Sequence, residues 1–498
     1  MPQDTHAAID LGSNSFHLVV ARVVGDDIHV LDRLKDQVQL ARGLDADGNL
    51  SDDAQQRALD SLARFNQRLR VVPPHQVRAV GTNTLRRVHD GGDFLARAEL
   101  ALGHPIEIIS GAEEARLIYL GVSYDLHDDG GARRLVVDIG GGSTECIVGE
   151  GDHILRADSL FMGCVGFTQR FFPDGRLTEA AFEQATVAAR LELGPVHRLY
   201  RRLGWSDVYG SSGTITAIQD ILQANGWGDH SITPVGLHSM RRALVAAGHV
   251  DAVTLPGLKP ERALVLAGGF AVLDAVFRSL GVEKLVAAQG ALREGVLLDM
   301  LGRLGHAGGD TREKSVRQLR DRYGADPAQA ERVERLALLL LAQVQDRWGL
   351  DPGDAGRALR WAAQLREIGM AIGYTGYHRH SSYLVENSVL PGFSRGEQCL
   401  VAALVLEQRR RIVLDRIRVL VGSQVERTTR LVLLLRLASR LNRTRSPKQR
   451  PRIDLQAGER TVHLAFPDGW LDDRPMTRAD LETEARAFAE VGYTLTWQ

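Results

Sequence analysis

The sequence predicts a duplicated α/β fold with two related phosphate-binding loops, followed by a helical region and a small α+β segment. Two observations carry this prediction. A short motif occurs twice, and the residue pattern changes from glycine-rich loops to helical Leu/Arg periodicity after about Gly302. The motif reads AAIDLGSNSFHLVVARVV at residues 7–24 and RLVVDIGGGSTECIVG at residues 134–149.

The two copies of the motif align on an aspartate at a spacing of 128 residues. The matched pairs are Asp10 and Asp138, Gly12 and Gly140, and Ser15 and Ser143. A strand that ends in Asp and turns through small residues brings backbone N–H groups close to an anion. Two such loops, one in each half, predict a phosphate chain held in the cleft between the halves.

Composition places the chain among ordinary globular proteins. It has 498 residues, 44% hydrophobic and 25% charged, and a net charge of −1. The 3 cysteines include no CxxC pair, which argues against a disulfide framework and fits a reducing compartment. The N-terminus lacks a signal-peptide pattern, and the apolar runs are far shorter than the roughly 20 residues of a membrane span. We expect a cytoplasmic protein with no integral membrane segment; peripheral association with the inner membrane stays open.

The first half predicts strands and helices in alternation. Apolar alternation from Ile9 to Val30 predicts a three-stranded antiparallel meander. Helical spacing predicts a helix from Ser51, the expected N-cap, to Arg70. The stretch VRAVGTNTLRR then reads as strand, loop and helix start. PIEIISGAEEARLIYLGV reads as strand, turn and helix, with a capping-box pattern at Ser110 and Glu113.

The second half repeats this plan. The Asp138 meander is followed by an expected helix from about Thr178 to Leu203. Three strand–loop–helix pieces are then expected: DVYGSSGTITAIQDIL, LAGGFAVLDAVF and LVAAQGALREGVLLDML. Loops at the carboxyl ends of strands place the binding crevice at those ends.

After about Gly302, glycine loops become rare and Leu/Arg helical periodicity dominates to about Thr444. Linkers are expected at LGHAGGD (304–310) and SPKQRP (446–451). The last stretch has two strand-like pieces, TVHLAF and YTLTW, around a helix, which predicts a small α+β cap. The expected domains are residues 1–125, 126–303, 304–446 and 447–498.

Three loops rich in Gly and Ser are candidates for phosphate binding, because small residues offer backbone and hydroxyl donors without bulk. A turn between strands is the alternative for any single loop, but three loops in one chain favour binding. The candidate residues are Ser13, Asn14, Ser15, Gly140, Gly141, Gly142, Ser143, Thr144, Gly210, Ser212, Gly213 and Thr214.

Three carboxylates beside these loops, Asp10, Asp138 and Glu145, are candidate ligands of Mg²⁺. A polyphosphate or nucleotide site needs a cation, and Mg²⁺ takes one or two carboxylates together with waters and phosphate oxygens. The alternative for the two aspartates is that each caps its own turn through side-chain hydrogen bonds.

Glu114 opens a helix directly after a strand and a glycine turn, so it is a candidate general base. Stabilisation of the first helical turn is the alternative. Arg86, after the GTNTL loop, and Arg293, after the AAQGAL loop, are candidate phosphate ligands. A solvated helix arginine is the alternative for each.

Residues 401–450 hold 13 Lys and Arg against 3 Asp and Glu. This excess is either a track for a long polyanion or a solvated face of Leu-rich helices. Nucleic acid is not an expected partner, because no reading motif is present and only 6% of residues are aromatic. His378 and His380 are expected to be surface or interface residues, with metal binding as the alternative.

These strings together resemble the bacterial exopolyphosphatase / guanosine pentaphosphatase family over nearly the whole chain. The strings are AAIDLGSNSFH, GTNTLRR, EIISGAEEARLIYLGV, VVDIGGGSTE, FMGCV, GSSGT, GALREGVLLDM and HRHSSYLVENSVLPGF. The resemblance implies two actin-like, sugar-kinase-like (ribonuclease H-like) α/β domains, then an all-α domain similar to His–Asp phosphohydrolases, then a small α+β C-terminal domain.

The resemblance also implies Mg²⁺-dependent, often K⁺-stimulated, stepwise hydrolysis of terminal phosphate from polyphosphate, usually by a homodimer. It makes Glu114 the leading general base. It matches Asp138, Gly140 and Glu145 to the loop that carries metal and phosphate, and Arg86 to the arginine after the first-domain loop. Arg366 and Glu367 stand where a metal-binding domain of the His–Asp type would have its ligand pair. We therefore expect no catalytic metal in the helical domain.

The strings GGGST and HRHSSY favour the exopolyphosphatase branch, so the expected activity is processive release of orthophosphate from inorganic polyphosphate (EC 3.6.1.11). Three alternatives stay open. The first is hydrolysis of guanosine pentaphosphate to the tetraphosphate. The second is an ATP-dependent kinase or ATPase on the same scaffold, for which no adenosine pocket is evident. The third is a non-catalytic sensor of the alarmone or of polyphosphate.

Overall fold

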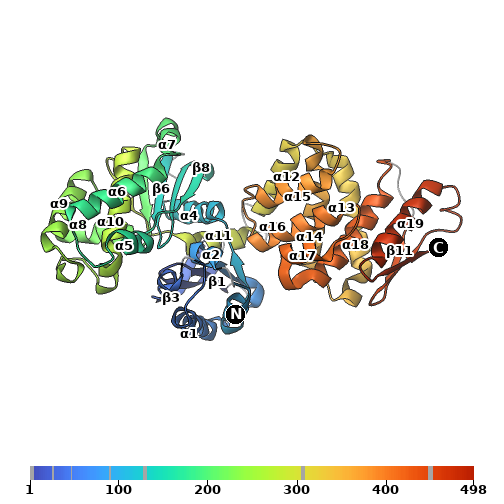
Figure 1. Ribbon diagram of the computed structural model, residues 1–498, viewed down its shortest axis with the longest axis horizontal. Helices are drawn as coiled ribbons and strands as arrows, with labels where there is room; N and C mark the ends of the chain where they lie inside the picture. The colour runs from blue at the N-terminus through green and yellow to red at the C-terminus, as the bar shows by residue number, and fades with distance from the viewer. Residues whose placement is uncertain are drawn as a thin grey trace. The chain divides into compact units, whose positions relative to one another are not determined.

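A computed structural model describes residues 5–24, 27–45, 47–88, 91–126, 132–303, 309–446 and 452–498. The chain divides into two compact units, Met1–Asp310 and Thr311–Gln498 (Figure 1). Most of each expected linker, at 304–310 and 446–451, lies outside the described residues.

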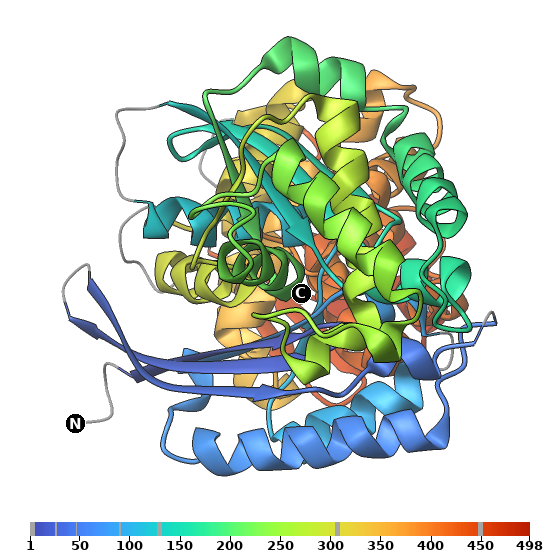
Figure 2. The ribbon, with the colours of Figure 1, turned by 90° about the vertical axis from the view of Figure 1, so that its left-hand side faces the viewer.

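The first half of unit 1 is built on a mixed sheet with the order β3-β2-β1-β4-β5. β1, β2 and β3 form the predicted antiparallel meander, and β4 and β5 join it in parallel. The strands are β1 (Thr5–Leu11), β2 (Phe16–Val24), β3 (Asp27–Asp36), β4 (Val77–Gly81) and β5 (Ile106–Ile108). Helices α1 (Asp52–Leu69) and α3 (Gly91–Leu102) cover one face of this sheet (Figure 2).

The second half repeats the first. Its sheet has the order β10-β9-β6-β7-β8, which is the same order read from the other edge. The strands are β6 (Arg133–Ile139), β7 (Thr144–Glu150), β8 (His153–Leu160), β9 (Asp207–Ser211) and β10 (Val286–Ala287). Asp10 pairs with His17 as Asp138 pairs with Glu145. The duplication seen in the motif therefore extends to strand order and register.

Helices of unit 1 begin where the sequence predicts them in most places. Ser110 accepts a hydrogen bond from the Glu113 amide at the start of α4, as expected. The helices not yet given are α2 (Asn83–Arg87), α4 (Gly111–Asp125), α5 (Cys164–Phe171), α6 (Glu179–Leu193), α7 (His197–Leu203), α8 (Gly213–Ala224), α9 (Pro234–Ala247), α10 (Pro260–Leu280) and α11 (Leu292–Arg303). The single helix expected over 178–203 is two helices, because Gly194 and Pro195 interrupt it.

The strand–loop–helix expected in LAGGFAVLDAVF is wrong. This stretch lies inside the continuous helix α10. Its Gly268 and Gly269 are not loop residues; a Cβ on Gly268 would lie 2.5 Å from the Thr168 backbone nitrogen, so glycine permits close packing on α5. Among the described residues, α10 alone has the length and hydropathy of a membrane span, and 83% of that stretch is buried, as in the core helix of a globular protein.

α4 and α11 pack between the two sheets, in a core that draws residues from both halves. The two helices cross at glycines. A Cβ on Gly295 would overlap the Leu117 carbonyl of α4, and a Cβ on Gly290 would overlap the Gly121 carbonyl. Only glycine allows the two backbones to approach this closely.

Unit 2 holds the predicted Leu-rich helices and a three-stranded sheet of order β11-β12-β13. One apolar core runs from the helices into this sheet. The elements are α12 (Thr311–Arg322), α13 (Pro327–Trp348), α14 (Pro352–Leu365), α15 (Tyr377–Asn387), α16 (Arg395–Glu407), α17 (Leu414–Val421), α18 (Val425–Leu441), β11 (Asp454–Ala457), β12 (Thr461–Ala465), α19 (Pro475–Ala489) and β13 (Thr494–Trp497).

Replacement of Gly295 by Ala should destabilise unit 1 by about 2 kcal/mol or more, because the new methyl group would overlap the Leu117 carbonyl. Gly166→Ala in α5 is the matched control, since its Cβ would meet open space. We expect the control to be neutral or stabilising by about 0.4–1 kcal/mol. Thermal unfolding followed by circular dichroism measures both. Equal midpoints for the two variants would contradict the close crossing.

Candidate active site

The two aspartate loops adopt the same turn and touch each other. The Gly12 amide donates to the Ser15 carbonyl at 3.2 Å, and the Gly140 amide donates to the Ser143 carbonyl at 2.9 Å. A Cβ on Gly141 would lie 2.9 Å from the Cβ of Ser13. The glycines of the second loop are therefore needed for the two halves to meet.

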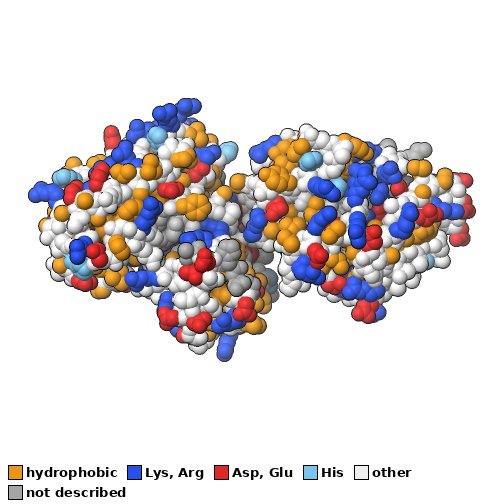
Figure 3. Space-filling view, in the orientation of Figure 1, with side chains coloured by type: hydrophobic (Ala, Val, Ile, Leu, Met, Phe, Trp, Pro, Cys, Tyr) orange, Lys and Arg blue, Asp and Glu red, His pale blue; other side chains and the backbone are white. Residues whose placement is uncertain are grey.

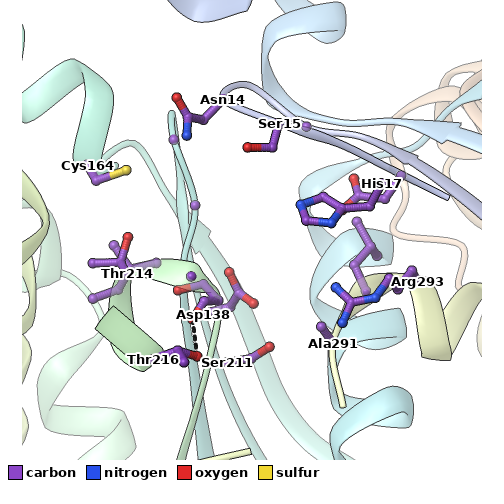
Figure 4. A pocket seen from close by; sticks show the side chains of 18 of the residues that line it. Asn14, Ser15, His17, Asp138, Cys164, Ser211, Thr214, Thr216, Ala291 and Arg293 are labelled. Carbon is purple, nitrogen blue, oxygen red and sulfur yellow. Dashed lines mark hydrogen bonds between the residues drawn. The ribbon is translucent and has the colours of Figure 1, made fainter. Parts of the chain in front are cut away.

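A cavity of about 510 Å³ opens where these loops meet, and residues of both halves line it. In Figure 4, His17 and Arg293 lie on one side of the cavity, Cys164 and Thr214 lie on the other, and Asp138 lies between them. The predicted site residues that line it are Asp10, Ser13, Asn14, Ser15, Glu114, Asp138, Gly140, Gly141, Gly142, Ser143, Ser212, Gly213, Thr214 and Arg293.

Four predicted residues are not among the lining residues. Arg86 lies behind Glu114 and pairs with it. Glu145 is 1% exposed on β7, beside Asp138, and the Ser159 hydroxyl donates to it at 2.7 Å. Thr144 is buried, with its hydroxyl directed to the Met162 carbonyl. Gly210 lies within β9.

Four carboxylates, Asp10, Glu114, Asp138 and Glu145, interact electrostatically at the base of the cavity. Burial, reinforced by Glu114, raises the pKa of Asp10 to about 8. Burial, against a hydrogen bond from Ser211, raises the pKa of Asp138 to about 7. The pKa of Glu145 is raised well above its usual value by burial and by the charges of Glu114 and Asp138. The site concentrates negative charge that a cation would stabilise.

Glu114 is held in place by Arg86. The Arg86 Nη1 donates to Glu114 Oε2 at 2.9 Å and to the Ile109 carbonyl at 2.8 Å. Burial raises the pKa of Glu114, although Arg86 opposes the shift. A carboxylate with a raised pKa at the first turn of a helix is suited to accept a proton near neutral pH.

The residues at the base of the cavity fit Mg²⁺. Within the described part of the chain, Asp10 Oδ1 is buried without a hydrogen-bond partner. No cluster of 3 or more His, Cys, Asp or Glu that could hold a metal ion by itself occurs among the described residues. Mg²⁺ commonly binds through one or two carboxylates plus waters and phosphate oxygens. An ion that arrives with a phosphate substrate matches this arrangement.

The amino end of α8 faces the cavity, where the helix dipole favours an anion. Ser212, just before this helix, has a φ of 93°, a left-handed conformation that is rare for a residue other than glycine. A Cβ on Gly213 would overlap the Arg262 guanidinium, so Arg262 packs directly over the loop.

The sequence reasoning missed a set of cations in the same cavity: Arg33 and Lys35 of β3, and Lys259 and Arg262 at the start of α10. Burial and the charge of Arg262 lower the pKa of Lys35. The available signal was the LKPER stretch, where Pro260 opens a helix between two cations.

His17 was also missed, although it occupies the position in the first motif that Glu145 occupies in the second. Burial lowers the pKa of His17 to about 3, and the nearby charges of Arg293 and Lys35 contribute. A neutral imidazole therefore lines the cavity beside the cations. The duplication places the histidine in one half and the carboxylate in the other.

Comparison with known proteins agrees with this geometry. The family model described as Ppx/GppA phosphatase family matches residues 19–304, and that described as Ppx/GppA phosphatase, domain III, matches residues 311–485. The chain belongs to the Ppx/GppA phosphatase family. These matches confirm the resemblance seen in the sequence. The members of this family are hydrolases of phosphoanhydride substrates.

Full-length relatives in the Ppx/GppA family include proteins named guanosine-5'-triphosphate,3'-diphosphate pyrophosphatase. The one from Vibrio cholerae is 41% identical over 99% of this chain and 97% of its own length. The one from Aeromonas hydrophila is 39% identical over 98% of this chain and 97% of its own length. Neither relative is named an exopolyphosphatase, which is the branch that GGGST and HRHSSY favour in this sequence.

A solved structure of an exopolyphosphatase from Cytophaga hutchinsonii superimposes with a TM-score of 0.55 at 26% identity. It covers 61% of this chain and 100% of its own length. An Aquifex aeolicus Ppx/GppA enzyme superimposes with a TM-score of 0.50 at 24% identity, covering 59% of this chain and 99% of its own length. The duplicated α/β fold of unit 1 is thus the fold of the Ppx/GppA family.

In unit 2, Arg366 and Glu367 form an internal ion pair. Arg366 Nη2 lies 2.5 Å from Glu367 Oε1, and Arg445 Nη2 lies 2.8 Å from Glu367 Oε2. His378 lies buried on α15, and burial together with nearby arginines lowers its pKa to about 4. His380 is half-buried on the same helix.

Many arginines of the 401–450 stretch are committed to ion pairs within unit 2. Arg436, for example, is 1% exposed and binds Glu484 at 2.7 Å. Others that contact acidic side chains are Arg411, Arg416, Arg418, Arg430, Arg440, Arg443 and Arg445. Figure 3 shows Lys and Arg side chains gathered over this unit with Asp and Glu among them. These pairs favour the interpretation of the basic stretch as a solvated face of Leu-rich helices over its interpretation as a track for a polyanion.

The carboxylate cluster predicts a pH-dependent cost to stability. The pKa of Asp138 rises from 3.8 to about 7 on folding, so the folded state binds more protons than the unfolded chain between these values. Stability should therefore fall as pH rises through this window, and the loss is complete above it. We expect Asp138→Asn to be more stable than wild type at pH 8 by roughly 1–3 kcal/mol, and no more stable near pH 4.

Calorimetric unfolding at the two pH values measures this difference, with the exposed Asp229→Asn as the control. An Asp138→Asn protein that is less stable than wild type at pH 8 would show that the cost of burying the Asp138 charge is not the dominant effect.

Proposed function

We propose that this protein hydrolyses the terminal phosphate of guanosine pentaphosphate, giving the tetraphosphate and orthophosphate. The observation that carries this proposal is one cavity with two anion-binding regions. The glycine loops and the amino end of α8, over which Arg262 packs, form the first, and the cations Lys35 and Lys259 form the second. A nucleotide with phosphate arms on two positions of its sugar needs two such regions. The names of the full-length relatives support the same substrate.

In the proposed reaction, the loops at Ser13–Ser15, Gly140–Ser143 and Ser212–Thr214 hold the 5' triphosphate arm. Their amides and hydroxyls donate to phosphate oxygens and align the terminal phosphorus for in-line attack. Glu114 orients a water and takes its proton as the water oxygen bonds to the terminal phosphorus. The bond from that phosphorus to the bridging oxygen breaks, and the departing tetraphosphate keeps the electron pair.

Arg86 keeps Glu114 oriented, and Arg293 lies within reach of charge that develops on the phosphate. Asp10 and Asp138, with Glu145 behind them, would hold Mg²⁺. When bound, the ion neutralises phosphate charge and polarises phosphate oxygens. A K⁺ requirement, a homodimer and a cytoplasmic or peripheral inner-membrane location belong to the same proposal.

Hydrolysis of inorganic polyphosphate is the second candidate. The likeness of unit 1 to a structure titled as an exopolyphosphatase supports it. The basic stretch of unit 2, which would form the polyanion track of a domain of the His–Asp phosphohydrolase type, gives weaker support, because many of its arginines bind acidic neighbours. Arg409 and Arg410 remain the best probes of this track.

Glu114→Gln should lower kcat for phosphate release by about 10²–10⁴-fold with little change in KM, because the variant keeps its hydrogen bond to Arg86 but cannot take a proton. Release is measured with Mg²⁺ and K⁺ on guanosine pentaphosphate and on long-chain polyphosphate. Glu283→Gln, at an exposed position, is the control. A Glu114→Gln protein with most of its turnover intact would rule out the general base.

The two substrates are separated by a second set of variants. We expect Lys35→Ala with Lys259→Ala to raise KM for guanosine pentaphosphate about 10–100-fold, from the loss of charge-assisted contacts to its second phosphate arm. Tripolyphosphate lacks that arm, so its KM should change less than about threefold. The exposed Arg190→Ala outside the cavity is the control. Equal losses on both substrates would favour a linear polyphosphate path.

A further inference from the structure

A buried ionic network lies at the crossing of α4 and α11 and reaches into β4 and β5. It contains three arginines and three carboxylates, so its formal charges balance. The members are Arg78, Glu107, Glu113, Arg116, Asp299 and Arg303. None of them lines the cavity.

Asp299 is the centre of this network and is 3% exposed. Its Oδ2 accepts from Arg78 Nη1 at 2.7 Å and from Arg303 Nε at 2.9 Å, and its Oδ1 accepts from Arg116 Nη2. Burial would raise the pKa of Asp299, but the three arginines outweigh it and hold that pKa below the usual range. Asp299 therefore joins β4, α4 and α11 as a permanently charged acceptor.

The network reaches the catalytic helix one residue from the general base. Both oxygens of Glu113 accept from Arg116, at 2.7 and 2.8 Å, and Arg116 in turn binds Asp299. Glu114, the next residue of α4, faces the cavity and binds Arg86. Two adjacent carboxylates therefore face different surroundings, because Glu113 binds the network and Glu114 lines the cavity.

The network also reaches Arg293, the arginine of α11 that lines the cavity, through this helix. Arg293 lies in the first turn of this helix and lines the cavity, and Asp299 lies two turns further on. Between them, Gly295 packs closely on Leu117 of α4, where a Cβ would overlap the Leu117 carbonyl. The glycine contact sets how near the helices come, and the ionic contacts set where along their length they meet.

We propose that Asp299 is a positioning residue that holds α4 in register with α11 through Arg116, and thereby sets Glu114 against Arg293. The inference rests on the proposed function of Glu114. A displacement of about 1 Å at reacting groups can cost about 100-fold in rate, so loss of the register should appear in kcat and leave substrate binding largely intact.

The test compares Asp299→Asn with Glu107→Gln. Each variant removes one carboxylate charge from the network. Glu107 contacts Arg78 and Arg303, so its variant leaves the contact between Asp299 and Arg116 in place. We expect Asp299→Asn to lower kcat about 10–100-fold with KM changed less than threefold, and Glu107→Gln to keep kcat within twofold. Both should lower the thermal midpoint.

Hydrogen exchange of the α4 amides gives a readout that does not depend on activity. Asp299→Asn should speed exchange in the first turns of α4, whereas Glu107→Gln should leave it near wild type. If wild type releases no phosphate from either substrate, the proposed function fails while the exchange result still tests the positioning role. If exchange and kcat change equally in both variants, Asp299 is only structural and the inference is overturned.

A charge-balanced variant covers the case in which Asp299→Asn folds poorly. Asp299→Asn with Arg303→Gln restores equal numbers of positive and negative groups, so its midpoint should recover. Its kcat should stay low, because a neutral amide at position 299 is a weaker acceptor for Arg116 of α4 than the carboxylate is. Recovery of kcat together with stability would overturn the positioning role.

Discussion

The burial of four carboxylates where two loops meet is the constraint on which the rest of unit 1 depends. Like charges in a site of low polarity repel one another, and each resists ionisation. Asp10, Glu114, Asp138 and Glu145 stay together only because the surrounding fold holds them there. Such stored repulsion is typical of sites that bind cations and polyanionic substrates.

Two kinds of contact hold this arrangement. Glycines allow backbones from the two halves to approach, at Gly141 against Ser13 and at Gly295 against Leu117. Ionic contacts fix direction, because Arg86 orients Glu114 and Asp299 gathers three arginines at the helix crossing. Packing at the glycines alone would allow α4 and α11 to slide along each other, and the ionic contacts alone would allow the two helices to separate. The two kinds of contact together hold the helices in one arrangement.

The duplication explains both the symmetry of the site and its asymmetry. The two halves share strand order, the pairing of an aspartate with the residue seven positions later, and the hydrogen-bonded turn that follows. They differ at that paired residue, where the first half has His17 and the second has Glu145. One half can therefore offer a neutral ring to a substrate while the other offers a carboxylate behind the phosphate loop.

Much of the site could be predicted from local pattern. The aspartate loops, the GSSGT loop and the Ser110-capped helix carrying Glu114 are each encoded within about ten consecutive residues, where backbone geometry follows from residue type. The helix α10 could not be predicted in the same way. Its paired glycines read locally as a loop, and only packing against α5 makes them helical.

The sequence by itself determined the family, the duplicated loops and most of the residues by which these loops line the cavity, because these features depend on short stretches of chain. The tertiary structure decided which distant groups share the cavity: Lys35 from β3, Arg262 from α10 and Arg293 from α11. It also decided that Asp299 binds Arg116 on the helix that carries Glu114 and that many basic residues of unit 2 are paired. Their partners are far away in the sequence, and only long-range packing brings such groups together.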